Sequence, residues 1–423
     1  MDIAIVGAGI GGLTAALSLH QAGLRARIYE SVTEIRPLGV GINVLPHATK
    51  ELEDLGLLPA LESSGVITRE VVYATRRGDV IWNEPRGRYA GYRWPQVSIH
   101  RGTLQMLLFE AVKARLGADA VVPDHEAVDV TQEGARATVH FRRRSNGEAL
   151  PAVTADLVIA ADGIHSSIRA KFHPQEGPPK WGGMTLWRGT TVARPLLTGA
   201  TMVISGNARA KFVCYPIRNL ADGRQLVNWI ADLATRESDF STVADWNRTG
   251  SRDAFLPAYA AWSSQVLDIP ALVGAAEAVY EYPMSDRDPL PSWVFGRVTL
   301  LGDAAHAMYP IGSNGAAQAV LDARTLALQL ATQPSVDAAL AAYDAARRPA
   351  MAGLLAAHRA EGADVILDIL EARAPQGTED LEQALPYAER EAIALKYKRM
   401  AGFDLQRLND APPMTPPRRM PGL

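Results

Sequence analysis

The sequence predicts an α/β fold in which a parallel sheet flanked by helices is interrupted by a β-rich domain and followed by further helices. Three strands predict it. The first runs into a glycine-rich turn and a helix at the N-terminus, the second ends at Asp162-Gly163, and the third ends at Gly302-Asp303. Parallel strands that are buried on both faces are continuously apolar, and ligands bind at their carboxyl ends. Shorter runs rich in aromatic and β-branched residues lie between these strands and are typical of a second sheet.

The first element is a strand, a tight turn and a helix. Residues Asp2 to Val6 are rich in Ile and Val, and a helical pattern follows from Leu13 to Leu19. The turn places Gly7, Gly9 and Gly12 at G-x-G-x-x-G spacing. The first glycine permits the turn, the second lets the backbone approach a pyrophosphate, and the third lets helix and strand pack closely. The turn therefore predicts a dinucleotide site, with a glycine-rich packing turn as the alternative.

The second strand ends at an acidic residue. After Gly23, residues Arg25 to Tyr29 form a strand that ends at Glu30. An acid about 20 residues beyond such a turn binds ribose hydroxyls. Because its charge would repel a 2′-phosphate, we expect FAD or NAD rather than NADP at this first site.

The middle of the chain predicts two helices and a set of strands. Helical periodicity covers His47 to Leu58 and Arg101 to Leu116. A strand of a small β-meander is expected at Ala137–Phe141, and a buried parallel strand at Asp156–Ala161. The other β-rich runs, expected in the second sheet, include Val71, Val72, Tyr73, Ile81 and Trp82, and the segment from Met184 to Ile230 with Trp187, Phe212, Tyr215 and Trp229.

The last part of the chain is expected to be helical. A third strand, Val298–Leu301, precedes a helix from about Asn314 to Leu330, and helical sequence continues to about Leu370. A charged helix near Glu389 to Met400 precedes Pro412–Pro417, which is expected to be disordered. The predicted domains are a discontinuous nucleotide-binding domain at 1–70, 98–180 and 290–345, a β-rich substrate domain at 71–97 and 181–289, a helical extension at 346–410 and a disordered tail at 411–423.

The composition shows little charge bias. The 423 residues are 48% hydrophobic, and 43 Lys and Arg against 46 Asp and Glu give a net charge of −3, so neither nucleic acid nor an anionic membrane is expected as a partner. The sequence contains no apolar run of bilayer length and no signal-peptide pattern, so we expect a cytoplasmic location. The single cysteine, Cys214, excludes an internal disulfide and is expected to be buried. No spacing of His, Cys or carboxylate residues predicts a metal site.

The three turns together resemble those of the class A flavoprotein monooxygenases, the group of para-hydroxybenzoate and salicylate hydroxylases. The resemblance extends from Ile3 to about Arg348, and the segments Ser98–Gln105 and Tyr282–Pro291 are similar to those of the 5-methylphenazine-1-carboxylate monooxygenases. It implies an FAD-binding Rossmann-like domain of the glutathione-reductase type. It also implies NAD(P)H as a transient co-substrate and O2 as the oxidant. The implied reaction is hydroxylation of a planar aromatic or heteroaromatic substrate, with or without a carboxylate, through a flavin C4a-hydroperoxide.

The resemblance also assigns cofactor residues. The loop Arg36–Gly41 resembles the loop that flanks the isoalloxazine ring, and the Asp162-Gly163 turn matches a motif that serves both FAD and the nicotinamide donor in relatives. The turn at 312–315 opens a helix whose N–H groups would stabilise negative charge on the flavin, with an ordinary capped turn as the alternative. The expected cofactor-binding residues are Gly7, Gly9, Gly12 and Glu30 for the ADP half, Arg101 and Gln105 for the pyrophosphate and ribityl region, Asp303 for the ribityl chain, and Gly41, Asp162, Gly163, Gly312, Asn314 and Gly315.

Fewer residues are assigned to the substrate side. Arg188 follows Trp187 in a segment that resembles a family motif whose arginine lies near the flavin. We therefore expect both residues at the active-site face, with Arg188 binding an acidic substrate or steering the reactive oxygen; a surface ion pair is the alternative. Tyr215 and Tyr309 are expected to line the pocket, with ordinary core packing as the alternative, and Pro310 is expected to stiffen the approach to the flavin.

The residues leave other functions open. A hydrolase is disfavoured because no serine lies in a G-x-S-x-G turn, and His306 in the third turn is expected to be structural. A flavin dehydrogenase or oxidase on the same fold is the main alternative, whereas a halogenase is disfavoured by the lack of a Trp-x-Trp-x-Ile segment. A non-catalytic flavin-binding protein is the third alternative. Both a monomer and a homodimer are compatible with the sequence.

Overall fold

The structure is a computed structural model and describes residues 1–236, 248–262, 267–360 and 362–418. The N-terminal strand lies inside a six-stranded sheet that is parallel except at one edge. Ile5 pairs with Ile28 on one side and with Ile159 on the other, so the centre of the sheet is apolar. Across the sheet the strands are β18 (Val294–Phe295), β19 (Val298–Leu300), β12 (Leu157–Ala160), β1 (Asp2–Val6), β2 (Arg25–Tyr29) and β8 (Val121–Val122).

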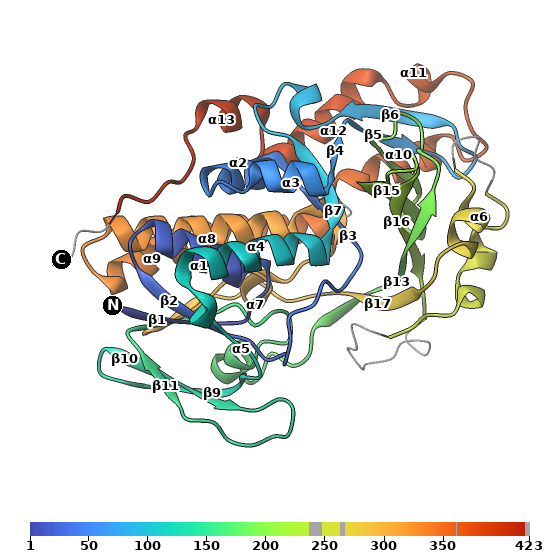
Figure 1. Cartoon of the computed structure of the whole chain (residues 1–423). Helices are drawn as coiled ribbons and strands as arrows, with labels where there is room; N and C mark the ends of the chain where they lie inside the picture. Colours follow the sequence, from blue (N-terminus) through green and yellow to red (C-terminus); the bar gives the residue numbers. More distant parts are fainter. Residues whose placement is uncertain (237–247, 263–266, 361, 419–423) are drawn as a thin grey trace.

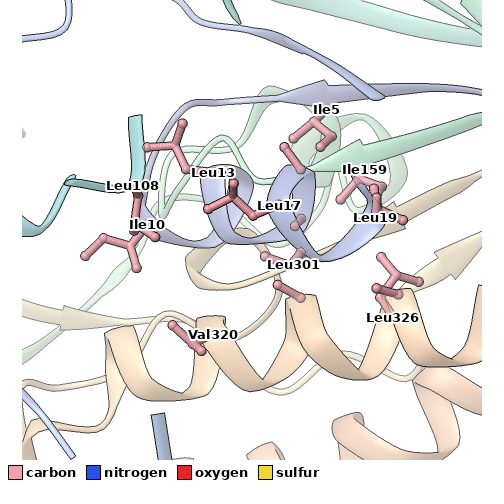
Figure 2. Close-up of a cluster of buried hydrophobic side chains, with 14 of the residues drawn as sticks. Ile5, Ile10, Leu13, Leu17, Leu19, Leu108, Ile159, Leu301, Val320 and Leu326 are labelled. Carbon is pink, nitrogen blue, oxygen red and sulfur yellow. The ribbon is translucent and has the colours of Figure 1, made fainter. Parts of the chain in front are cut away.

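Three helices form the main core with this sheet. Helix α1 (Ile10–Gln21) contacts both α4 (Arg101–Leu116) and α8 (Gly315–Thr332). Figure 2 shows side chains from β1, α1, α4 and α8 meeting in one apolar cluster, with Leu13 and Leu17 near its centre. Nearly all of α1 is buried because small and apolar residues occupy all its faces, as expected for a helix enclosed between layers.

The turn between β1 and α1 is as tight as its glycines predict. Gly7 has a φ of +102°, a left-handed conformation that favours glycine. A Cβ on Gly12 would lie 2.0 Å from the carbonyl oxygen of Gly7. No side chain fits at that distance, so Gly12 allows the helix to touch the turn.

A seven-stranded sheet forms the second part of the molecule and lies to the right in Figure 1. Its strands come from both β-rich segments of the sequence. The first segment supplies the hairpin of β5 (Glu70–Ala74) and β6 (Val80–Pro85), and β5 pairs in parallel with β14 (Thr201–Gly206) of the second segment. Across the sheet the strands are β17 (Val279–Asp286), β13 (Lys180–Ala193), β16 (Gln225–Ala234), β15 (Ala210–Asn219), β14 (Thr201–Gly206), β5 (Glu70–Ala74) and β6 (Val80–Pro85).

Two small sheets and further helices complete the fold. The predicted meander is a three-stranded sheet, with Ala137, Val139 and Phe141 buried on one face of its middle strand. Figure 1 shows this sheet below the six-stranded sheet, and the last helices along the upper edge of the molecule. The small sheets are β11 (Val153–Ala155), β10 (Arg136–Arg142) and β9 (Glu126–Glu133), and β3 (Gly41–Val44), β7 (Gln96–His100) and β4 (Val66–Thr68). The other α-helices are α2 (Pro46–Asp54), α3 (Leu58–Ser64), α5 (Ser167–Phe172), α6 (Ile269–Gly274), α7 (Asp303–His306), α9 (Val336–Arg359), α10 (Val365–Arg373), α11 (Leu381–Ala384), α12 (Tyr387–Met400) and α13 (Leu405–Asp410).

Two expectations differ from the structure. The helix expected at 47–58 is broken, because Gly56 has a φ of +70° and separates α2 from α3. The described part of the tail expected to be disordered, residues 411–418, contacts α2: the backbone N–H of Met414 donates to the Glu51 carboxylate, and Thr415 donates to Asp54. Composition predicted disorder there because proline lacks the N–H group that the hydrogen bonds of helices and sheets need. The N–H group of Met414 and the side chain of Thr415 nevertheless bind carboxylates of α2. Residues 419–423 lie outside the described residues.

Across the described residues, every helix is too short or too polar to cross a bilayer.

Candidate active site

A cavity of about 340 Å³ lies where the carboxyl ends of β1, β12 and β19 face the seven-stranded sheet. Its walls include the glycine-rich turn after β1, Gly163 after β12, and Gly302 and Asp303 after β19. The opposite wall is one face of the seven-stranded sheet. The three predicted turns therefore meet at one place, as expected for the ligand site of a parallel α/β sheet.

The first turn is tied to two side chains from other elements. The Ala8 N–H donates to Glu30 Oε2 at 2.7 Å, and Gln105 on α4 donates from Nε2 to the Ala8 carbonyl at 2.9 Å. Glu30 Oε1 also accepts from the Val32 N–H. Glu30 and Gln105 thus lie beside the turn and orient its backbone, and their contacts with FAD stay predictions.

The third turn is anchored from behind by a buried carboxylate. Asp322 on α8 accepts from the Gly302 N–H at 3.0 Å and lies 2.6 Å from His306 Nε2, and Arg347 donates to its other oxygen at 2.7 Å. Burial alone would raise the pKa of Asp322, but His306 and Arg347 lower it to about 2. His306 therefore belongs to a buried hydrogen-bonded group behind the turn, whereas Asp303 is exposed and lines the cavity.

The second turn carries an unusual carboxylate. Both oxygens of Asp162 are buried, and within the described part of the chain neither has a hydrogen-bond partner of normal geometry. Burial raises the pKa of Asp162, and the neighbouring Ser166 hydroxyl and the N–H groups of Ser167 and Ile168 oppose part of the rise. Asp162 is therefore a buried carboxylate at the turn beside the cavity, held only loosely by the donors of the helix that follows it.

The turn before α8 borders the cavity with glycines and is held by the C-terminal helices. Gly312 has a φ of +64°, and a Cβ there would lie 1.8 Å from the Tyr397 hydroxyl on α12. Asn314 donates from Nδ2 to that hydroxyl at 2.6 Å, and His358 Nε2 lies 3.0 Å from it. Asn314 is thus a buried support of the turn, whereas Gly315 begins α8 at the cavity wall.

One hydrogen-bonded group joins the two walls. The Gly41 N–H donates to Asn228 Oδ1 on β16 at 2.7 Å, and Arg188 on β13 donates from Nη2 to the Gly41 carbonyl at 2.9 Å. Arg101, the first residue of α4, is exposed to the same cavity. Arg188 is therefore a cavity residue and not a surface ion-pair partner.

The tyrosines predicted for the pocket line the cavity, and so does Pro310. Tyr215 on β15 is buried, and burial raises its pKa to about 12, with Arg188 opposing part of the rise. Tyr309 is half-buried. Trp187 does not share this wall: it stacks on Phe255 in the core behind the sheet, because neighbouring residues of a strand point to opposite faces.

Several cavity residues were missed by sequence reasoning. Lys211 on β15, Asp232 on β16 and Asp364, in a short turn before α10, form an ion cluster. Burial raises the pKa of Asp232 to about 6, with Lys211 opposing and Asp364 adding to the rise. Arg86 also lines the cavity beside Tyr73. Alternation along β15 from Tyr215 would have placed Lys211 on the cavity face, but only the fold brings Asp364 to it.

Comparisons with known proteins agree with this site. A family model described as an FAD binding domain matches residues 1–358. Phenazine 1,6-dicarboxylic acid hydroxylase PhzS from Lysobacter antibioticus is 45% identical over 333 residues, which are 78% of this chain and 82% of that protein. The 6-hydroxynicotinate 3-monooxygenase from Pseudomonas fluorescens is 31% identical over 339 residues, 77% of this chain and 81% of its own length.

Solved structures show the same fold. Klebsiella pneumoniae HpxO complexed with FAD and uric acid has a TM-score of 0.73 at 24% identity and covers 97% of each chain. A salicylate hydroxylase substrate complex has a TM-score of 0.70 at 22% identity and covers 98% of each chain. The chain therefore belongs to the FAD-binding family of flavoprotein aromatic monooxygenases, as its three turns predicted.

The residues at the strand ends fit FAD. Gly9, Gly163 and Gly315 line the cavity, and a Cβ on any of them would meet no described atom within 4 Å. A closely bound dinucleotide requires open space beside these three glycines. The space beside Gly7 and Gly12, in contrast, is filled by the protein's own backbone.

Proposed function

We propose that this protein hydroxylates a planar heteroaromatic carboxylate with FAD as its cofactor. The observation that carries the proposal is the single cavity, which joins the cofactor turns to a sheet face with both apolar and cationic groups. Arg188 borders it beside Ile230, its partner on the next strand, and Ile230 in turn pairs with Val213. A flat apolar strip next to a guanidinium suits an aromatic ring that carries a carboxylate. The relatives named for phenazine dicarboxylic acid and hydroxynicotinate act on such compounds.

The chain's own residues would bind FAD and orient it in the cavity. FAD, when bound, accepts hydride and activates oxygen. We propose that Gly9, Glu30, Arg101, Asp303 and the N–H groups from Gly312 to Gly315 hold it. The position of all of them except Glu30 on one cavity supports this, and Glu30 binds the Ala8 N–H of the turn that borders that cavity. The other predicted cofactor residues, Gly7, Gly12, Gly41, Gln105, Asp162, Gly163 and Asn314, would shape or support the same site.

Arg188 would hold the substrate carboxylate. Its Nη2 is committed to the Gly41 carbonyl, and its Nε is buried with no hydrogen-bond partner among the described residues. Tyr215, whose hydroxyl is protonated at neutral pH, would donate a hydrogen bond beside it. Tyr309 and Pro310 would cover the substrate from the flavin side.

The remaining parts of the proposal concern co-substrates and context. NADH or NADPH and O2 would be consumed, since the reaction class needs an electron donor and an oxygen source. The location would be the cytoplasm, which the single buried cysteine favours. A monomer and a homodimer are both compatible with the proposed site.

The test is turnover by the purified FAD-containing protein. Phenazine-1-carboxylate, phenazine-1,6-dicarboxylate and 6-hydroxynicotinate should accelerate oxidation of NADH or NADPH and oxygen uptake. At least one should give a product that carries one oxygen atom from O2, with or without loss of the carboxylate. Unsubstituted phenazine is the control for the carboxylate. Flavin reduction without oxygen insertion would favour a dehydrogenase or oxidase, and no stimulation by any compound would favour a non-catalytic flavoprotein.

A further inference from the structure

The end of the cavity away from Gly41 is lined by a buried ion cluster. Lys211 Nζ lies 2.6 Å from Asp364 Oδ2 and 3.6 Å from Asp232 Oδ2. Lys211, Asp232 and Asp364 are 8%, 4% and 8% exposed, and all three line the cavity. One lysine between two carboxylates leaves this end of the cavity with one negative charge. The Arg188 end has the opposite sign.

The sheet register separates the two ends. Asn228, which binds the Gly41 N–H, and Asp232 lie on the same face of β16, four residues or about 13 Å apart. Between them Ile230 pairs with Val213 on one side and with Arg188 on the other. Arg188 pairs with Ile230, two residues from Asp232, but its Nη2 binds the Gly41 carbonyl at the Asn228 end. The cavity wall is therefore an apolar strip whose guanidinium reaches toward one end and whose carboxylate lies at the other.

One atom of the cluster has no partner. Asp232 Oδ1 is buried, and no donor within hydrogen-bond distance is found in the described ranges. Asp232 Oδ2 faces Lys211, and the backbone carbonyl of Asp232 accepts from the Tyr259 hydroxyl, so the rest of the residue is fixed. A buried acceptor without a donor is costly, and a ligand that supplies the donor recovers that cost.

We infer that Asp232 Oδ1 is the specificity-determining acceptor for a hydrogen-bond donor on the substrate, a hydroxyl, amino or ring N–H group remote from its carboxylate. Lys211 and Asp364 are positioning residues: Lys211 holds the second oxygen of Asp232, and Asp364 holds Lys211. The inference rests on the proposed function, because Arg188 fixes the opposite end of the same substrate. The cavity thus selects a ring that is anionic at one end and donates a hydrogen bond at the other.

The C-terminal segment takes part in this selection. The family match ends at residue 358, and Asp364 lies beyond it, 153 residues after Lys211. The segment that follows the matched residues therefore supplies the carboxylate that holds Lys211.

The first test is a binding titration of the FAD-containing protein without NAD(P)H, followed by flavin absorbance. The probes are hydroxyphenazine-1-carboxylates with the hydroxyl on the ring remote from the carboxylate, each compared with its methyl ether. At least one hydroxyl compound should bind about 30-fold tighter than its ether, because a site with a buried acceptor rejects an analogue that lacks the donor. No preference for any pair would overturn the inference.

The variant Asp232→Asn distinguishes a hydrogen bond to the substrate hydroxyl from steric rejection of the methyl ether. The amide is isosteric, and its oxygen would turn toward Lys211 and its NH₂ toward the cavity. The preference for the hydroxyl should fall to about threefold or less or reverse, since the donor would then face another donor. A steric rejection of the ether would persist in this variant, and a persisting preference would overturn the inference.

Asp364→Asn tests the positioning role, with Asp368→Asn as its matched control. Asp368 lies in the same segment, where it accepts from the Ala208 N–H outside the cavity. Asp364→Asn should raise KM for the hydroxyl compound about fivefold with little change in kcat, and Asp368→Asn should leave both unchanged. Equal effects of the two variants would reduce Asp364 to a structural role. This comparison remains informative if Asp232→Asn fails to fold.

A wrong choice of substrate class can be distinguished from a wrong role for Asp232. If wild-type protein binds no phenazine carboxylate, the titration is repeated with 6-hydroxynicotinate and 6-methoxynicotinate. A preference for the hydroxyl compound that Asp232→Asn removes would keep the inference and overturn only the phenazine class. No preference in either series would overturn the inference itself.

Discussion

The two walls of the cavity are built in different ways. At the strand ends of the six-stranded sheet, the groups that face the cavity are mainly glycines and backbone N–H groups held by turns. On the seven-stranded sheet they are side chains at alternate positions, such as Arg188, Lys211 and Asp232. A wall made of backbone cannot change without moving the helices behind it, whereas side chains can be exchanged on an unchanged sheet. Cofactor binding is therefore coupled to folding in this protein, and substrate choice is separable from it.

The largest effect is expected at the first turn. Gly12→Ala would place a Cβ 2.0 Å from the Gly7 carbonyl oxygen, so α1 would have to move away from β1. We expect a loss of more than about 3 kcal/mol in the free energy of unfolding, together with loss of bound flavin, because overpacking against backbone has no side chain to yield. Urea unfolding and the flavin-to-protein absorbance ratio measure the two effects.

Gly9→Ala is the matched control for that variant. A Cβ there meets no described atom within 4 Å, so the stability of the flavin-free protein should change by less than about 1 kcal/mol. Flavin affinity should still fall at least about tenfold, because the added methyl group would occupy the cofactor's space. Equal flavin affinity in Gly9→Ala and wild type would show that this wall does not contact the cofactor as proposed.

The support behind the third turn should also link folding with cofactor binding. Asp322→Asn removes a charge that pairs with Arg347 and His306, and breaking a buried pair costs about 3–5 kcal/mol. The pKa of Asp322 is lowered from an ordinary 3.8 to about 2, so its contribution is present above pH 3.8 and is lost as the pH falls to 2. Wild-type protein should therefore lose about 2 kcal/mol more than the variant between pH 4 and pH 2.

Unfolding free energies of both proteins across that pH range, from urea titrations, provide the measurement. Parallel pH curves for wild type and variant would show that Asp322 is not the group whose titration weakens the turn.

The six-stranded sheet was the easier part to predict because its signals are contiguous. The bounds expected for β1, β2 and α4 are those of the structure, since each pairs a periodic apolar pattern with a glycine or capping turn. The three turns predicted their common cavity because parallel strands end at one edge of a sheet.

The seven-stranded sheet could be predicted only as a sheet. Alternation tells which residues share a face but not which face meets the cavity. It excludes Trp187 and Arg188 from the same face, and only the fold shows that Arg188 faces the cavity and Trp187 the core. Asp364 could not be found at all, because nothing near it in the sequence relates it to Lys211. Which of the predicted site residues touch cofactor or substrate stays a prediction.

Replacing Arg188 directly tests the cavity wall that the seven-stranded sheet forms. Arg188→Ala should raise the KM for a heteroaromatic carboxylate about 100-fold, because hydrogen bonds to charged groups contribute about 1.5–3 kcal/mol. Flavin content should stay near that of wild type, since the hydrogen bond of Arg188 on the cofactor side goes to the Gly41 carbonyl, whose loop is also bound by Asn228. Steady-state kinetics with the carboxylate and with its uncharged amide distinguish lost carboxylate binding from general damage.

Trp187→Phe is the control on the other face of the same strand. It loses the hydrogen bond to Glu281 but keeps an aromatic ring against Phe255, so we expect about 1 kcal/mol of destabilisation and an unchanged KM. A KM that rises as much as in Arg188→Ala would mean that the two faces are not independent.

The smallest effects are expected from another pair of neighbours, Cys214 and Tyr215 on β15. Tyr215→Phe removes only a hydroxyl and should raise the KM about fivefold, whereas Cys214→Ala should leave the KM unchanged and cost about 1 kcal/mol of stability. Burial raises the pKa of Cys214 to about 12, so its thiol should react with a thiol reagent at pH 8 only after unfolding. Rapid labelling of native protein would show that the core behind the sheet opens to solvent. The two faces of β15 would then not be separated as argued, and substrate binding could no longer be treated as independent of the fold.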